Sequence, residues 1–136
     1  MQVNVQTRYA LKALVYLAQQ NKYCSAKEIS DIESIPYYYL EKILLKLKKG
    51  EIIKVRLGAN GGYKLISNPK KITAYQVVKI FEETLAPVGC VAIEKSKKIF
   101  CPKSKNCATR KIWLTMQNNL SMTLKSMTIA SLVNGQ

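Results

Sequence analysis

Three of the four cysteines in this chain, Cys90, Cys101 and Cys107, lie within one stretch of eighteen residues. In a reducing cytosol, clustered cysteines are typical of metal ligands or redox-sensitive thiols rather than of structural disulfides. Thiolates are the standard ligands of iron–sulfur clusters, which ordinarily take four protein ligands. The chain contains no histidine, so the usual nitrogen ligand is missing. The three thiols therefore fit a metal site or a redox site, and a 2Fe–2S or 4Fe–4S cluster on them would have one iron position left open.

The fourth ligand has several possible sources. Glu94 is the only carboxylate inside the cysteine stretch. A backbone group, a water, a small thiol or a residue of a second subunit are the other options, and Cys24 is a formal one that lies far away in sequence. Iron that the protein ligates incompletely is reactive, as a sensor of nitric oxide, oxygen or thiols requires.

Zinc, reactive thiols and inert cysteines are the alternatives to a cluster. Structural zinc takes four closed N/S ligands, commonly with C-x2–4-C spacing, whereas the gaps here are ten and five residues. Lys103, Lys105 and Arg110 flank the cysteines, and cations lower the pKa of a nearby thiol. The same stretch therefore also fits a metal-free redox sensor.

The charge of the chain predicts a polyanionic partner, chiefly nucleic acid. Twenty-two Lys and Arg residues against eight Asp and Glu give a formal net charge of +14. A basic inert surface or an anionic membrane would also account for that balance. No apolar run is long enough to cross a bilayer, and the N-terminus lacks the features of a signal peptide, so we expect a cytoplasmic protein without a membrane span.

The elements that would position these groups begin with two amphipathic helices. The stretch "TRYALKALVYLAQQN" places four apolar residues at helical spacing, namely Leu11, Leu14, Val15 and Ala18. The stretch "SAKEISDI" opens with Ser25 three residues before Glu28, which is the spacing of a capping box.

A third helix is predicted in "SIPYYYLEKILLKLKKG", with Ser34 as its cap, Pro36 in its first turn and Gly50 as its stop. Its apolar stripe consists of Leu40, Ile43, Leu44 and Leu47. The opposite face carries Tyr38, Lys42, Leu45 and Lys49. A face of this kind suits entry into a DNA major groove, although solvated tyrosines and lysines give the same pattern.

Two short strands follow, "IIKVRL" and "YKLI", joined by "GANGG", in which Asn60-Gly61 predicts a tight hairpin turn. Three helices followed by a basic hairpin describe a winged helix-turn-helix, whose hairpin reaches the minor groove or the DNA backbone. A fourth helix, "KKITAYQVVKIFEE", has Thr73 and Gln76 at capping-box spacing.

From Ala108 to about Ser126 the pattern is helical again, with apolar residues close to the spacing of a coiled-coil seam: Trp113, Met116, Leu120, Leu124 and Met127. A helix of about twenty residues spans roughly 30 Å. In so small a chain, a two-fold partner helix is the simplest account of that length, and packing on the chain's own first helix is the alternative. We therefore expect a homodimer.

The predicted fold is mainly α with a small β-hairpin wing, in three parts. Residues 1–83 form a winged helix-turn-helix, residues 84–107 a cysteine-containing sensor loop, and residues 108–136 a dimerisation helix and C-terminal segment. The sensor loop is thus predicted to join the nucleic-acid-binding unit to the dimer interface.

Five motifs together resemble the IscR/NsrR/CymR family of bacterial transcription regulators: "TRYALKALVYLA", "YYYLEKILLKLKKGEIIK", "GANGGYKL", "CPKSKNCATRKIW" and "MTIASLV". The resemblance covers nearly the whole chain, in the right order. It implies a winged-helix dimer that binds double-stranded DNA at a palindromic promoter site. In several members it also implies an iron–sulfur cluster on three cysteines, which reports cluster status, nitric oxide, redox state or cysteine supply.

Three positions depart from the family pattern. IscR-like members have a histidine where this chain has Arg110, and NsrR-like members have an aspartate where it has Arg8. In the wing, Leu57 stands where the family usually has an arginine, and Arg56 precedes it. The fourth cluster ligand and the wing contacts therefore do not carry over by resemblance.

Within the winged helix-turn-helix, Tyr38, Glu41 and Lys42 are predicted to contact base edges. By resemblance, Glu41 matches a position that helps to select sequence, by accepting a hydrogen bond from a cytosine amine. The residues expected to contact the DNA backbone are Ser25, Lys27, Tyr37, Tyr39, Arg56, Asn60 and Lys64. Tyr39 also lies toward the core edge, where it would simply pack.

The sequence thus predicts a regulator rather than an enzyme or an electron carrier. It shows no paired catalytic carboxylates, no nucleotide-binding loop and no histidine base. The alternative function is a metal-free regulator of cysteine or sulfur metabolism, controlled by its thiols or by a partner protein.

Overall fold

The computed structural model describes residues 2–135. Its α-helices are α1 (Val5–Gln20), α2 (Ala26–Glu33), α3 (Tyr37–Lys49), α4 (Ala74–Phe81), α5 (Arg110–Ser126) and α6 (Ile129–Asn134). Its strands are β1 (Ile53–Arg56) and β2 (Gly62–Leu65), and its 3-10 turns are η1 (Pro69–Lys71), η2 (Gly89–Val91), η3 (Lys95–Lys97) and η4 (Ser104–Asn106). Within that range, no helix combines the length and apolarity that a bilayer span requires.

Helix α1 is the centre of the core and contacts α2, α3, α4, α6 and β2. Its fully buried positions include Ala10, Ala13, Leu14 and Leu17. The predicted stripe through Leu11, Leu14, Val15 and Ala18 was therefore only partly right, because Leu14 alone of that set is fully buried. Because other helices and β2 pack around α1, they bury more of its surface than a single amphipathic stripe would cover.

Helices α2 and α3 form the predicted helix-turn-helix. Ser25 caps α2 by accepting a hydrogen bond from the Glu28 N–H. The prediction that Ser34 caps α3 was wrong: Ser34 ends α2 in a left-handed conformation, and Pro36 is the residue before α3. A proline is tolerated at the start of a helix because the first N–H groups of a helix have no partner within it, so the missing N–H of Pro36 costs no hydrogen bond.

The wing is an antiparallel hairpin in which Ile53 pairs with Leu65 and Arg56 with Gly62. Five residues connect the strands, with the Gly61 N–H donating to the Gly58 carbonyl at 3.0 Å. The predicted tight turn at Asn60-Gly61 is thus a longer loop, in which Gly58 and Gly62, not Asn60, have positive φ. The backbone of Cys24 also pairs with Tyr63 through two hydrogen bonds of 2.8 and 3.0 Å, so the α1–α2 connection lies beside β2.

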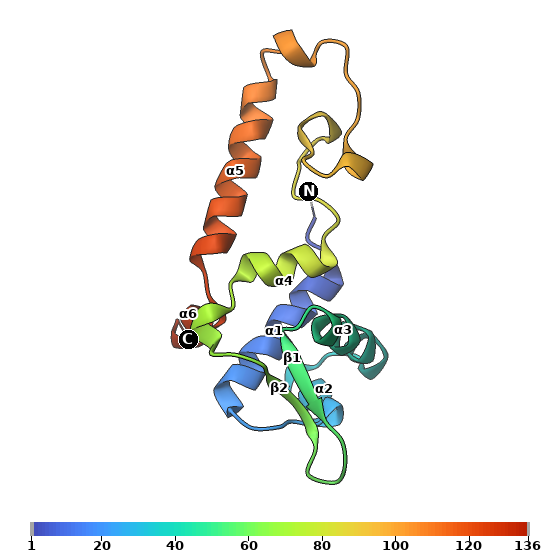
Figure 1. Ribbon diagram of the computed structural model, residues 1–136, viewed down its shortest axis with the longest axis vertical. Helices are drawn as coiled ribbons and strands as arrows, with labels where there is room; N and C mark the ends of the chain where they lie inside the picture. The colour runs from blue at the N-terminus through green and yellow to red at the C-terminus, as the bar shows by residue number, and fades with distance from the viewer. Residues whose placement is uncertain (1, 136) are drawn as a thin grey trace.

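Helix α5 extends away from this core, and the segment between α4 and α5 lies alongside it (Figure 1). Helix α4 begins with the predicted capping box of Thr73 and Gln76. After α5 the chain returns to the core, where Thr128 pairs with Thr73 and Ile129 of α6 is fully buried against α1. The last helix therefore packs on the N-terminal unit, while α5 and the cysteine segment project from it.

Candidate nucleic-acid interface and cysteine segment

The side of α3 opposite its buried stripe carries Tyr38, Lys42 and Leu45, all exposed to solvent. Tyr38 is 65% exposed, so its ring is available to a partner. The Lys42 ammonium donates to the Tyr38 hydroxyl at 2.7 Å and lies 4.3 Å from the centre of its ring. One turn of helix thus presents an aromatic and a cationic group together, a combination that nucleic-acid-binding surfaces use.

The other predicted contacts on α3 fall at its N-terminal end. The Glu41 carboxylate lies close enough to Tyr37 to raise the pKa of that phenol. Tyr39 packs toward the core, because its ring centre lies 6.3 Å from that of Tyr9 on α1. Tyr37 and Glu41 therefore accompany Tyr38 on the outer surface, whereas Tyr39 also joins α3 to α1.

Ser25 and Lys27 lie at the start of α2. The Ser25 hydroxyl is occupied as the helix cap. Lys27 pairs with Asp31 at 3.4 Å, and both side chains are largely exposed, so this ion pair contributes little to stability. Lys27 is therefore available to a phosphate, while a DNA contact of Ser25 would use a group that already serves the protein.

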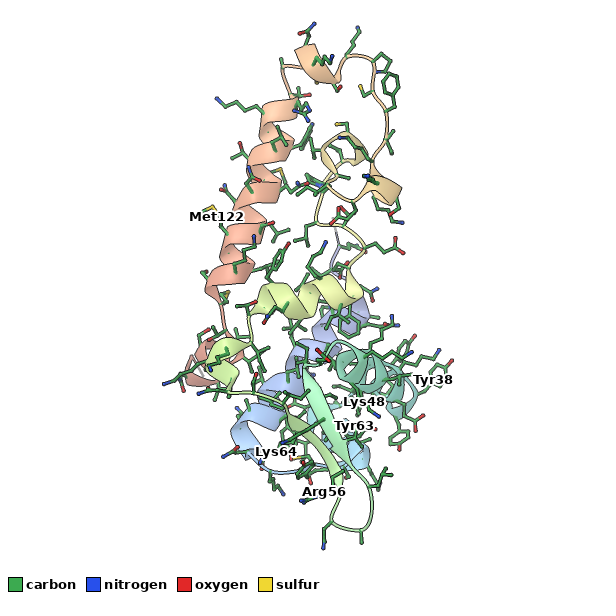
Figure 2. All side chains as sticks on the ribbon, viewed as in Figure 1. Tyr38, Lys48, Arg56, Tyr63, Lys64 and Met122 are labelled. Carbon is green, nitrogen blue, oxygen red and sulfur yellow. The ribbon has the colours of Figure 1, made fainter. Side chains whose placement is uncertain are left out.

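The wing residues Arg56, Asn60 and Lys64 lie together on the hairpin. Arg56 donates to the Asn60 carbonyl at 3.0 Å and stacks on Tyr23, with its guanidinium carbon 3.9 Å from the ring centre. The Lys64 ammonium lies 5.7 Å from the same ring centre. Figure 2 shows Arg56 and Lys64 on the hairpin and Tyr38 on α3, at the end of the molecule away from Met122 of α5.

Tyr23 was not predicted from the sequence. It lies in the α1–α2 connection, about forty residues from Lys64, so no local pattern places its ring against the wing. The consecutive glycines Gly61 and Gly62 are the one signal that could have pointed to a backbone passing close to the hairpin.

The three clustered cysteines are free thiols on the segment between α4 and α5. Cys90 lies in η2, Cys101 in an irregular stretch and Cys107 just before α5; Cys107 is exposed and the other two are half-buried. Among residues 2–135, no three Cys, His, Asp or Glu side chains are arranged so that they could hold a metal ion. Metal binding would therefore require the segment to draw these thiols together.

The surroundings of Cys107 suit an anionic group. Hydrogen bonds from Thr109, together with the Arg110 N–H and charge, lower the pKa of the Cys107 thiol. The Arg110 Nε is buried and has no hydrogen-bond partner within residues 2–135. The Arg110 backbone N–H and charge favour a thiolate at Cys107, which is the form of cysteine that ligates a cluster, so the chemistry of this donor agrees with the predicted cofactor.

Glu94, the possible fourth ligand, is engaged within the protein. Its two carboxylate oxygens accept hydrogen bonds from the Lys79 ammonium at 2.5 Å and the Thr84 hydroxyl at 2.7 Å. The hydrogen bond from Lys79 is the main reason that the pKa of Glu94 is lowered to about 2. Glu94 would have to exchange these partners to bind iron.

Cys24 is fully buried and pairs with Tyr63 of β2. The hairpin lies at the opposite end of the molecule from the chain that leads into α5 (Figure 1). Burial is the main cause that raises the pKa of its thiol to about 11. Cys24 is therefore unreactive in the folded chain and distant from the other thiols.

The predicted dimer seam runs along α5. Trp113, Met116 and Leu124 are half-buried within the chain, whereas Leu120 and Met127 are 44% and 38% exposed. Helix α5 contacts α4 and η2 on its inner side. Apolar surface thus remains along α5 after the chain's own contacts are made.

Comparisons with known proteins agree with the motif-based resemblance. The family model Rrf2, described as "Iron-dependent Transcriptional regulator", matches residues 3–135. Protein rrf2 of Nitratidesulfovibrio vulgaris is 32% identical over 135 residues, which covers 98% of this chain and 87% of that protein. The HTH-type transcriptional regulator NsrR of Shouchella clausii is 38% identical over 104 residues, covering 75% and 70% of the two chains.

Among solved structures, CymR, titled the global cysteine regulator of B. subtilis, matches with a TM-score of 0.84. The match covers 100% of this chain and 98% of that one at 24% identity. The predicted winged-helix fold and family resemblance are confirmed. The similar proteins are named as transcriptional regulators, which also agrees with the prediction that the chain is not an enzyme.

Proposed function

Since the chain belongs to the Rrf2 family of transcriptional regulators, we propose that it binds palindromic promoter DNA as a cytoplasmic homodimer. We further propose that an iron–sulfur cluster held by Cys90, Cys101 and Cys107 sets its affinity for DNA. The observation that carries the DNA-binding part is the outer face of α3, where Tyr38 and Lys42 stand exposed above a fully buried stripe. In a helix-turn-helix, this second helix is the one that enters the major groove.

Several features support the cluster. The chain offers three free thiols on one segment, the surroundings of Cys107 favour an anion, and the family model is described as iron-dependent. When bound, a cluster supplies iron that nitric oxide, oxygen or thiols can attack. Cys90, Cys101 and Cys107 would hold the cluster, and Glu94 would be one option for the open iron position after it leaves Lys79.

The position of the cysteine segment suggests how binding there changes DNA affinity. The segment leaves α4, which packs on α1 of the DNA-binding unit, and enters α5, which carries the proposed dimer seam. The conformation of the cysteine segment therefore influences how the two α3 helices of a dimer are spaced and tilted. Two such helices must lie about 34–36 Å apart to enter successive major grooves. A small change in their spacing is therefore enough to change the affinity for DNA.

Metal analysis of matched cysteine variants tests the proposal. Wild type, Cys101→Ala and Cys24→Ala are purified without oxygen, and iron, sulfide and visible absorption are measured per subunit. Wild type and Cys24→Ala should hold near-stoichiometric iron and sulfide, while Cys101→Ala holds neither and loses the dependence of DNA affinity on cluster state. Iron retained by Cys101→Ala would contradict the ligand assignment.

A metal-free thiol regulator is the second candidate. It is favoured by the separation of the three thiols within the described chain and by the lowered pKa of Cys107. The structurally similar CymR is titled a cysteine regulator, which makes cysteine or sulfur metabolism the corresponding signal. Wild-type protein that stays colourless and iron-free after attempted reconstitution, yet binds DNA, would support this candidate.

A further inference from the structure

We infer that Tyr23 is a positioning residue for DNA binding: its ring holds Arg56 and Lys64 of the wing together as one cationic site for the phosphate backbone. This inference rests on the proposed DNA-binding function. It concerns a residue outside both the recognition helix and the hairpin, and it assigns a role to a side chain that would not itself touch a base.

The backbone places Tyr23 against the hairpin. Cys24 pairs with Tyr63 in both directions, so the α1–α2 connection acts as a third, short strand beside β2. Continuing this antiparallel register sets Tyr23 opposite Lys64. Arg56 pairs with Gly62, two residues along β2 from Lys64, so Arg56 and Lys64 are diagonal neighbours on one face of the hairpin.

Gly62 makes this close approach possible. A Cβ at that position would lie 2.4 Å from the Cys24 carbonyl oxygen, and the φ of Gly62 is +141°. Only a glycine accommodates both the contact and the backbone conformation. Gly62 thus allows the α1–α2 connection, and with it Tyr23, to pack against the hairpin.

The contacts of Tyr23 restrict the motion of two cationic side chains on the hairpin. The Arg56 guanidinium lies 3.9 Å from the ring centre and donates to the Asn60 carbonyl, while the Lys64 ammonium lies 5.7 Å from the same ring. Two like charges repel, and the electron-rich face of one aromatic ring offsets that repulsion. Arg56 and Lys64 are thereby held against the same ring on one face of the hairpin, where both can contact the phosphate backbone.

A double-mutant cycle on DNA affinity tests the role of Tyr23. The probe is a duplex of about 30 base pairs that the wild-type protein has selected from a random-sequence pool, titrated at several salt concentrations. Tyr23→Leu should weaken binding about fivefold, as expected for a loss of cation–π contacts. It should also make the slope of log affinity against log salt concentration shallower by up to about one. Tyr23→Phe keeps the ring and should recover most of that loss.

The coupling to Arg56 separates positioning from general stability. In an Arg56→Gln background, Tyr23→Leu should weaken binding less than twofold further, because the nearer of the two cations that the ring holds is already absent and only the more distant Lys64 contact is left to lose. An equal loss in both backgrounds, or a Tyr23→Phe variant as weak as Tyr23→Leu, would overturn the inference. Wild-type protein that selects no duplex would instead overturn the proposed DNA-binding function itself.

Discussion

The Lys79 ammonium of α4 donates to Glu94 Oε1 of the cysteine segment at 2.5 Å, and the two side chains are only 30% and 28% exposed. Water and salt therefore screen this ion pair less than an ordinary surface pair. Thr84 occupies the second carboxylate oxygen. The pair fastens the cysteine segment, at a position after Cys90, to a helix of the DNA-binding unit, so the order of that segment depends on it.

Lys79→Met should loosen the cysteine segment without unfolding the core. The loss of a charged hydrogen bond of this kind costs about 1.5 kcal/mol, which corresponds to an about tenfold larger population of the open segment and about tenfold faster amide exchange. Amide exchange at Ile99, whose N–H donates to the Gly89 carbonyl at 3.0 Å, reports that opening. Lys97→Met removes a more exposed pair with Glu83 and should change exchange less than twofold. Equal exchange at Ile99 in wild type and Lys79→Met would mean that other contacts hold the segment.

The hydrogen bond between Tyr16 and Glu28 should stabilise the protein only over a middle range of pH. The Tyr16 hydroxyl donates to Glu28 Oε2 at 2.5 Å; this bond lowers the pKa of Glu28 and is the main cause that raises the pKa of Tyr16 to about 12. A lowered Glu28 pKa means that the contribution is present above the unfolded value of about 4.3 and is lost as pH falls below it. A raised Tyr16 pKa means that the contribution to stability is present below the unfolded pKa of about 10 and is lost as pH rises through the folded pKa of about 12.

Urea unfolding of wild type and Tyr16→Phe measures this contribution. The stability difference should be about 1–2 kcal/mol between pH 5 and pH 9 and should shrink at pH 3.5. Asp31→Asn, which alters an exposed carboxylate on the same helix, is the matched control. A difference that stayed constant down to pH 3.5 would show that the phenol packs there without an ionised Glu28.

The elements that the sequence predicted well are those whose pattern is local. The stripe of α3, which consists of Leu40, Ile43, Leu44 and Leu47, is fully buried as the helical period requires. The opposite face of α3 is exposed. The capping box of Thr73 and Gln76 forms both of its hydrogen bonds. Each of these depends on residues three or four apart, which a single sequence displays directly.

The features that the sequence did not reveal depend on contacts between distant residues. Tyr23 meets Arg56 because the α1–α2 connection pairs with β2, and α6 returns to bury Ile129 against α1. The wider burial of α1 has the same origin, because four other helices and a strand surround it. The arrangement of the cysteines was also beyond prediction, since their irregular segment has no repeating pattern.

Gly62→Ala should destabilise the wing far more than Gly58→Ala. Both glycines have positive φ, but a Cβ at Gly62 meets the Cys24 carbonyl oxygen at 2.4 Å, whereas nothing lies within 4 Å of one at Gly58. Gly58→Ala should therefore cost about 1 kcal/mol of backbone strain. Gly62→Ala should cost about 3 kcal/mol, because the hairpin must also move away from the α1–α2 connection. Equal losses in urea unfolding would indicate that the connection yields without resistance.

Leu120→Glu should separate the proposed dimer, whereas Met122→Glu should not. Leu120 lies on the seam of α5 and is 44% exposed; Met122 lies about 200° away around the helix and is 68% exposed. A charge buried in an apolar interface is costly, so the dimer dissociation constant should rise about a hundredfold for Leu120→Glu, measured by sedimentation. Affinity for a two-fold site should fall in parallel, because one subunit then reads only one half-site. Two monomeric variants, or two dimeric ones, would place the interface somewhere other than this seam.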